Sequence, residues 1–283
     1  MADPTDLPSV PAHCQGLWRR TLLAVPSAAR DGSGDGLRDT TTCVHWLQTP
    51  LWHGDLRVPA NRPDFSGIHA LADCSDAQLR WLLTQQGFAG VTRVGDEVVQ
   101  GVPRSVCRWQ RRIDLAESEV PDIGWLGLDA TGLDEWGVEA DYHERWVATE
   151  GASADAKHGA LGLGWSHAQP ANDTGARTVC LRVGDWAMHL RSRTLDAATT
   201  RQARRAAAED LPMDRATLIA AADFEISLAR WTPGGVGGFG AGWRIAHSSW
   251  PWREGAWLHP DDPTAWAAAG ASALPGTAAG LKE

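Results

Sequence analysis

The sequence of 283 residues is poor in several residue types, and these shortages exclude several classes of protein. It has one tyrosine, three methionines and only two lysines, so nearly all of its basic charge is arginine. Its five cysteines are scattered and never form a Cys-x-x-Cys pair, which argues against a disulfide framework and against a thiolate zinc site. No stretch approaches the run of about 18 apolar residues that predicts a membrane-spanning helix. We therefore expect free thiols and no membrane partner.

The charge balance disfavours a nucleic-acid partner. The formal net charge is -9 at pH 7, whereas proteins that bind nucleic acids usually carry a basic patch that neutralises phosphates. The first residues also lack the basic and apolar segments of a signal peptide. We expect a cytoplasmic protein.

Tryptophan is the residue in excess, with 16 copies. Many of the indoles lie in segments whose apolar residues alternate, such as residues 17–25, 40–48 and 106–115, and this pattern predicts strands around a wide interior. The segment after Cys74 differs, because Ser75 and Gln78 form a capping box that predicts one short helix. The N-terminal half is therefore read as a β-barrel with a helical insertion.

The order of elements in this half returns later in the chain. The segment TVCLRVGDWAMHLRSR resembles TTCVHWLQTPLWHGDLRVP, and helical stretches at 201–211 and 214–225 take the place of the first helix. This return favours internal duplication, with chance similarity of short β segments as the alternative. The predicted fold is mainly β, with two tandem antiparallel β-barrels that each carry a short helical insertion. Its predicted parts are an N-terminal tail (1–16), a barrel domain (17–150), a linker (151–176), a second barrel domain (177–260) and a C-terminal tail (261–283).

Three segments, WLQTPLWHGDLRVP, DIGWLG and EWGVEADYHERW, carry a resemblance to a bacterial family of uncharacterised proteins. That family is similar to the fungal Hri-type proteins, which have two lipocalin-like β-barrels in tandem. In the family, an acidic residue and a glycine precede an aromatic-x-Glu-x-Trp stretch, and here Glu135-Trp136-Gly137 precedes Tyr142-His143-Glu144-Arg145-Trp146. The resemblance covers residues 17–260 in the order of elements. It implies the lipocalin-like double barrel and no particular activity.

Two charged residues fall on strand faces that are otherwise apolar, and they define the candidate site. By alternation, Arg111 points the same way as Trp109, and Glu144 the same way as Tyr142 and Trp146. Buried charges must be paired or face a wet cavity, so a structural Arg111–Glu144 pair and a ligand site are both open. The candidate ligand-binding residues are Arg111, Glu144, Tyr142, Trp109, Trp146 and His45.

Histidines supply further candidates. His45 shares a strand face with Cys43 and Leu47, while His53, Asp55 and Arg57 share a face of the next strand. By alternation, His247 points inward with Trp243 and Ile245. No H-x-H, H-x-x-x-H or HExxH spacing is present, so no metal is expected, although a barrel can assemble a metal site from distant strands. The Gly-rich stretch at 234–242 lies between β segments with no helix after it, so no dinucleotide cofactor is expected.

Three functions remain open from the sequence. The first is a lipocalin-like protein that binds a small, partly apolar molecule, with Arg111 as anchor for a ligand carboxylate. The second is a cofactor-free lyase, isomerase or hydrolase in which Glu144, Tyr142 and His45 supply acid and base. The third is an interaction scaffold of two packed barrels. An open interior lined by the polar residues favours the first two, and a filled interior favours the third.

Overall fold

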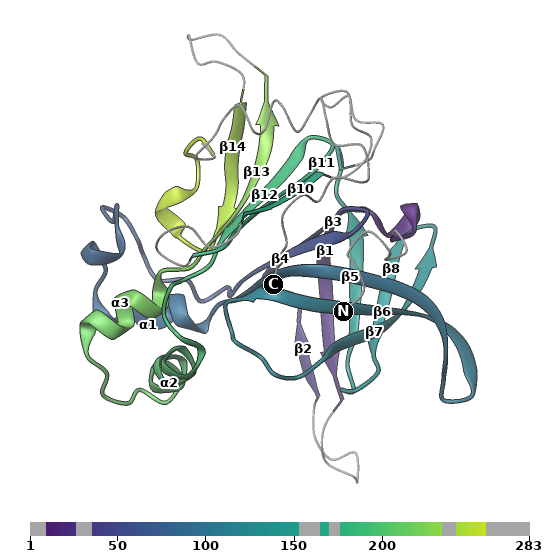
Figure 1. Ribbon diagram of the computed structural model, residues 1–283, viewed down its shortest axis with the longest axis horizontal. Coiled ribbons are helices and arrows are strands. Elements are labelled where there is room, and N and C mark those ends of the chain that lie inside the picture. Colours follow the sequence, from purple (N-terminus) through teal and green to yellow (C-terminus); the bar gives the residue numbers. More distant parts are fainter. Residues whose placement is uncertain (1–9, 27–35, 153–164, 170–175, 234–241, 259–283) are drawn as a thin grey trace.

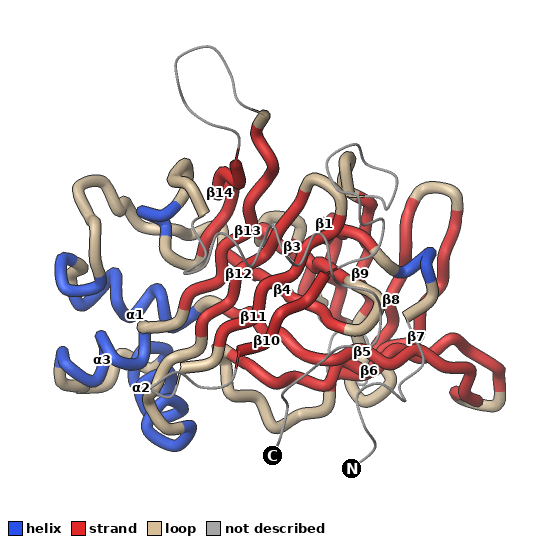
Figure 2. The backbone as a smooth tube through the Cα atoms, turned by 45° about the horizontal axis from the view of Figure 1, so that its top comes forward, coloured by secondary structure: helices blue, strands red, loops and turns tan. Residues whose placement is uncertain are grey.

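The computed structural model describes residues 10–26, 36–152, 165–169, 176–233 and 242–258, with only the backbone described at 165–169. Two antiparallel sheets and a group of three helices make up this part of the chain. The helices gather on one side of the molecule, at the left in both views, and the strands fill the rest (Figures 1 and 2).

The N-terminal half forms a closed barrel. Its strands are β1 (Gly16–Val25), β2 (Leu37–Asp39), β3 (Cys43–Gln48), β4 (Trp52–Val58), β5 (Gln86–Val99), β6 (Val102–Asp114), β7 (Asp122–Asp129), β8 (Gly132–Gly137) and β9 (His143–Ala148). Each strand from β3 onward pairs with the next, and β9 pairs with β1, which closes a ring of eight strands. The short β2 pairs only with the end of β1. The barrel predicted for the first half is confirmed.

The C-terminal half forms a five-stranded sheet in chain order. Its strands are β10 (Trp165–Gln169), β11 (Thr178–Val183), β12 (Trp186–Arg191), β13 (Glu225–Thr232) and β14 (Gly242–Ser248). In the part of the chain that is described, no pairing joins β10 to β14, so this sheet has two edges. A second closed barrel therefore stays a prediction. The predicted C-terminal tail and most of the predicted linker lie outside the described residues.

The helices are insertions between strands, as predicted for both halves. They are α1 (Asp76–Thr84), α2 (Ala197–Ala208) and α3 (Arg215–Ala222), and three short 3-10 turns are η2 (Ala12–Cys14), η3 (Leu71–Asp73) and η4 (Pro251–Arg253). Ser75 and Gln78 form the predicted capping box of α1. Asp196 and Asp214 are the N-cap residues of α2 and α3. Their side chains accept hydrogen bonds from backbone N–H groups in the first turn, which have no partner within the helix. No described helix has the length and apolar character that crossing a bilayer requires.

The main apolar core lies between the barrel and the second sheet, not inside the barrel. The outer faces of β3, β4 and β5 pack against the inner face of the second sheet and against the helices. At Gly54 the two sheets come so close that a Cβ atom would lie 2.6 Å from Met188 Sδ, which accounts for the glycine. The buried side chains of this core include Leu47, Leu56, Ala89, Leu181, Met188, Leu190, Leu218 and Ile226. The residues inside the barrel form a separate set from this core.

Candidate functional site

The interior of the barrel has two chemically different ends, which follow from strand alternation. One end, the tryptophan end, is filled by Trp18, Trp46, Trp109 and Trp146 with Cys107 and Leu133. The ring of Trp46 meets the rings of Trp109 and Trp146 edge to face, with centroids 5.6 and 5.8 Å apart. This arrangement suits aromatic quadrupoles. The predicted ligand walls Trp109 and Trp146 are therefore close-packed core residues.

The segment before β1 lies beside this end, although it was predicted to be part of a tail. Val10 and Cys14 are each 1% exposed, and the backbone N–H of Val10 donates to Pro50. The indole of Trp18 donates to the carbonyl of Cys14 at 2.9 Å. The described part of the predicted tail is thus packed against the barrel.

The opposite end, the polar end, is where β4, β6 and β8 finish and β5, β7 and β9 begin. Three guanidinium groups and six carboxyl groups gather there with one phenol. They are Arg20, Arg57, Arg111, Asp39, Asp55, Asp114, Asp122, Glu135, Glu144 and Tyr142. The carboxyl groups outnumber the guanidinium groups, so the potential at this end is negative.

Glu144 is the centre of one ion-pair network. Its Oε1 accepts from Arg20 at 2.6 Å and lies 3.8 Å from Nη1 of Arg57. Arg20 also donates to Asp39 at 2.7 Å, and Arg57 donates to Asp55 at 2.7 Å. Glu144 is only 3% exposed, so these partners offset a desolvation cost that an isolated carboxylate could not bear.

Arg111 belongs to a different part of the polar end. Its terminal nitrogens donate to Asp114 at 3.0 Å and to Asp122 at 2.8 Å, and its guanidinium lies over the ring of Phe88 at 4.0 Å. The direct Arg111–Glu144 pair considered from the sequence is wrong, because each residue has partners on other strands. The carboxylate-binding fork of Arg111 is already occupied by two aspartates.

Glu135 is the functional candidate that alternation missed. It lies opposite Glu144 in the β8–β9 register and is 4% exposed. Tyr142 donates to its Oε1 at 2.7 Å, and Trp146 donates to its Oε2 at 3.2 Å. Burial, together with the charges of Glu144 and Asp122, raises the pKa of Glu135 well above its ordinary value.

Two adjacent carboxyl groups are therefore placed in contrasting surroundings, since Glu144 is ion-paired and Glu135 meets only neutral donors. This contrast is typical of acid–base pairs. Alternation along β8 alone indicates this position, because Glu135 lies two residues after the apolar Leu133 and therefore points to the same face of the strand.

A chain of hydrogen bonds ends at a buried acceptor inside the barrel. The Nε2 group of Gln48 donates to two carbonyls, so its Oε1 accepts, and the Thr92 hydroxyl donates its proton to that oxygen at 2.8 Å. The contact of 2.9 Å between Thr92 Oγ1 and His53 Nδ1 then requires Nδ1 to carry the imidazole proton. Nε2 of His53 is left as an acceptor. Burial and the charge of Arg111 lower the pKa of His53 to about 3, which keeps the ring neutral.

His53 Nε2 and Arg111 Nε share an unusual feature. Both atoms are buried, and neither has a hydrogen-bond partner among the described residues. Both side chains pack on Phe88, His53 with ring centroids 5.6 Å apart and Arg111 from above. Gly90, which has no side chain, pairs with His53 on one side and with Arg111 on the other. The two side chains therefore share neighbours in the polar half, where they leave one unpaired acceptor and one unpaired donor, and each costs free energy while it stays unpaired.

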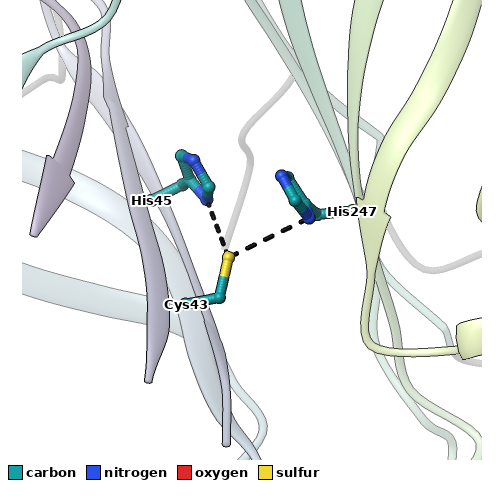
Figure 3. Close-up of side chains that lie close together, drawn as sticks. All are labelled: Cys43, His45 and His247. Atoms are coloured by element: carbon teal, nitrogen blue, oxygen red, sulfur yellow. Dashed lines mark hydrogen bonds between the residues drawn. The ribbon is translucent and has the colours of Figure 1, made fainter. Parts of the chain in front are cut away.

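His45 lies outside this site. It shares a face of β3 with Cys43 and Leu47, as predicted, but this face is the outer one and looks toward the second sheet. Its ring stacks on that of His247 with centroids 4.8 Å apart, and Cys43 Sγ lies 3.6 Å from His45 Nδ1 and 3.9 Å from His247 Nδ1 (Figure 3). The structure does not bring His45 to Glu144 and Tyr142.

A β-bulge accounts for the position of His247. Ala229 pairs with Ile245, but the next pair is Leu228 with His247, so Ala246 is an extra residue. Trp243 and Ile245 therefore face the outer cluster, whereas His247 faces the barrel. The prediction that His247 shares a face with Trp243 and Ile245 is wrong, because a bulge reverses every later side chain.

No family model, no curated protein and no solved structure matched this chain. The resemblance to the family related to the Hri-type proteins stays a prediction. The fold and the geometry of the polar end carry the functional argument.

Proposed function

We propose that this protein binds a small molecule in the polar half of its barrel, in the manner of a lipocalin-like protein, and that the ligand carries a hydroxyl or an amine. The observation that carries the proposal is the pair of buried, unpartnered atoms His53 Nε2 and Arg111 Nε. A hydroxyl group, or an amine in its neutral form, can donate and accept at once, so either suits both atoms.

The charge of the polar end indicates which ligands fit. Six carboxyl groups face three guanidinium groups, and the negative charges of Glu144 and Asp122 already raise the pKa of Glu135. A ligand carboxylate would enter this negative potential and find the fork of Arg111 occupied. A neutral ligand meets no such penalty, and it keeps the lone pair that Arg111 Nε–H needs. The ligand is therefore a polyol or an amine in preference to the acidic molecule that the sequence alone favoured.

Access comes from the polar end, because the other end is filled. The Arg57 and Arg111 side chains are 21% and 22% exposed, whereas Trp146 is 1% exposed. Phe88, with two guanidinium groups over its ring, supplies an apolar wall next to the polar atoms. A ligand of a few heavy atoms fits this description better than a long apolar one.

A ligand screen with matched variants tests the proposal. Panels of small polyols, primary amines and monocarboxylates are added to the wild type, and the melting temperature and the native mass are measured. We expect polyols or amines to raise the melting temperature and monocarboxylates to have little effect. Arg111→Lys keeps the charge but removes Nε–H, so it should weaken binding at least tenfold. Arg108→Lys on the same strand, at an exposed ion pair with Glu97, should not.

Two outcomes would overturn the proposal. One is that no panel member and no co-purifying molecule binds. The other is that Arg111→Lys binds as tightly as the wild type while remaining folded. Either result favours the scaffold function, in which the polar end only supports the barrel.

A second candidate, acid–base catalysis without a cofactor, is favoured by one observation. Glu135 and Glu144 are cross-strand neighbours in unlike surroundings, with Tyr142 bonded to Glu135. A protonated Glu135 could donate a proton while ion-paired Glu144 accepts one, as in an isomerase, lyase or hydrolase. Any ligand found in the screen is incubated with the protein in D₂O and returned to H₂O before its mass is measured, so that only deuterium on carbon remains. Unchanged mass supports binding alone, whereas deuterium uptake or breakdown that Glu135→Gln abolishes supports catalysis.

A further inference from the structure

We infer that Cys43, His45 and His247 form a binding site for a thiophilic transition metal ion of the zinc type, at the seam between the barrel and the second sheet. Cys43 and His45 come from β3 of the barrel, and His247 comes from β14 of the second sheet (Figure 3). Their ligand atoms all lie within 4.8 Å of one another. This site is separate from the polar end and independent of the function proposed for it.

The donor set selects the class of metal. One thiolate and two imidazoles suit zinc and neighbouring first-row metals, whereas calcium and magnesium require oxygen ligands. Three protein ligands with a fourth position left to water or another molecule is the arrangement of many zinc sites with chemical roles. Cys43 and His247 are partly exposed and His45 is buried, so solvent can reach the fourth position.

The sulfur–nitrogen separations are close to those of a tetrahedral centre. Bond lengths of about 2.3 Å to sulfur and about 2.0 Å to nitrogen place sulfur and nitrogen about 3.5 Å apart at the tetrahedral angle. Sγ of Cys43 lies 3.6 Å from Nδ1 of His45 and 3.9 Å from Nδ1 of His247. These separations need to change by only a few tenths of an ångström, whereas the stacked rings of His45 and His247 must turn toward a common point.

The backbone holds these residues in place. Cys43 and His45 are two residues apart on one face of β3, which pairs with β1 and β4. His247 reaches the same region only because the bulge at Ala246 turns it toward the barrel. Bulges frequently re-aim a side chain at a functional position.

The charged groups near the site are paired with each other. Arg62 donates to both carboxylate oxygens of Glu254 at 2.9 Å, and Glu254 also accepts from the backbone N–H of Ser248, the residue after His247. The thiol and the two imidazoles are thus the donor set of the site.

A bound ion would link positions 43 and 45 to position 247. The barrel half and the second sheet also meet through apolar packing, hydrogen bonds and ion pairs such as Arg62–Glu254, and metal binding should stabilise their contact further.

Cobalt titration of the reduced, chelator-treated full-length protein tests the site. We expect one Co²⁺ per chain, a thiolate-to-cobalt charge-transfer band and displacement of Co²⁺ by Zn²⁺. Cys43→Ser should abolish the band, and His247→Gln should weaken binding at least tenfold. The matched controls are Cys74→Ser, at another buried cysteine, and His69→Gln, at an exposed histidine. Both should bind like the wild type.

A second measurement separates loss of the site from loss of folding. All variants are compared by circular dichroism and by melting temperature, first without metal and then with excess Zn²⁺. We expect Zn²⁺ to raise the melting temperature of the wild type and of both controls, and to leave Cys43→Ser and His247→Gln unchanged. The inference is overturned if the wild type takes up no Co²⁺ or Zn²⁺, or if folded Cys43→Ser and His247→Gln bind as the wild type does.

Discussion

The two ends of the barrel interior differ in what they bury: one end buries apolar indoles, and the other buries charged groups. At the tryptophan end, packed indoles remove apolar surface from water and leave little polar surface to satisfy. At the polar end, guanidinium and carboxyl groups take the place of the indoles. Burying these groups costs free energy, which their ion-pair partners only offset. The first end stabilises the fold, and the second is retained at a cost to stability. That difference favours a functional polar end.

The largest effect should come from the tryptophan end. Trp146→Ala removes a side chain that is 1% exposed and that contacts Trp46, and it also removes a donor to Glu135. We expect a loss of about 4 kcal/mol in the free energy of unfolding, measured by urea denaturation. Trp125→Ala is the control, because this partly exposed indole stacks on Trp136 outside the core, and it should cost about 1 kcal/mol. Equal losses would contradict the assignment of the tryptophan end as the core of the barrel.

The polar end should respond through uncompensated charge. Arg20→Met leaves Glu144 and Asp39 without their main partner, and we expect a loss of about 3 kcal/mol. Adding Glu144→Gln to Arg20→Met should recover a large part of that loss, since it removes the unpaired charge. Arg108→Met, at an exposed pair with Glu97, should change stability by less than about 1 kcal/mol. If the double variant is no better than Arg20→Met, charge is not the cause.

A smaller effect should follow from cutting the hydrogen-bond chain that reaches His53. Thr92→Val removes the acceptor of His53 Nδ1, and we expect a loss of about 1 kcal/mol. Nitrogen NMR on the wild type should show His53 protonated at Nδ1 and not at Nε2, and Thr92→Val should release this preference. Thr84→Val, at a hydroxyl that donates to the carbonyl of Trp81, is the control and should leave the His53 signals unchanged. A wild-type proton on Nε2 would remove the free acceptor on which the proposed ligand site depends.

The sequence predicted the barrel better than it predicted the site, for physical reasons. Alternation is a local property of a strand, so it placed Arg111, Tyr142 and Glu144 inside a ring that the structure confirms. The pairing between charged residues depends on the register and tilt of the strands. A local sequence pattern does not determine register or tilt. Arg20 donates to Glu144 across 124 positions, so this pairing could not be read from the sequence.

Two further failures have the same origin. Alternation back from Glu144 along one continuous strand puts Glu135 on the opposite face, whereas a turn divides the segment into β8 and β9 and both carboxyl groups are buried. His247 was assigned to the wrong face because one extra residue at Ala246 reverses the alternation. Both errors concern a single irregular residue or turn, and both hid a residue of a candidate site.

The most specific effect concerns the protonation of Glu135. Its pKa in the folded protein is raised, so the folded state keeps a proton that the unfolded chain releases near pH 4.5. Stability should therefore fall as pH rises above about 4.5, by at most about 1.4 kcal/mol per pH unit, until the folded pKa is reached. Glu135→Gln removes this term, so the variant should gain on the wild type with rising pH in urea denaturation curves. Glu97→Gln is the control, because the hydrogen bond from Arg108 lowers the pKa of exposed Glu97: this variant should lose on the wild type as pH rises toward about 4.5 and run parallel to it above that pH. Parallel curves for the wild type and Glu135→Gln would show that Glu135 is ionised in the fold, and the polar end would then lack its acid.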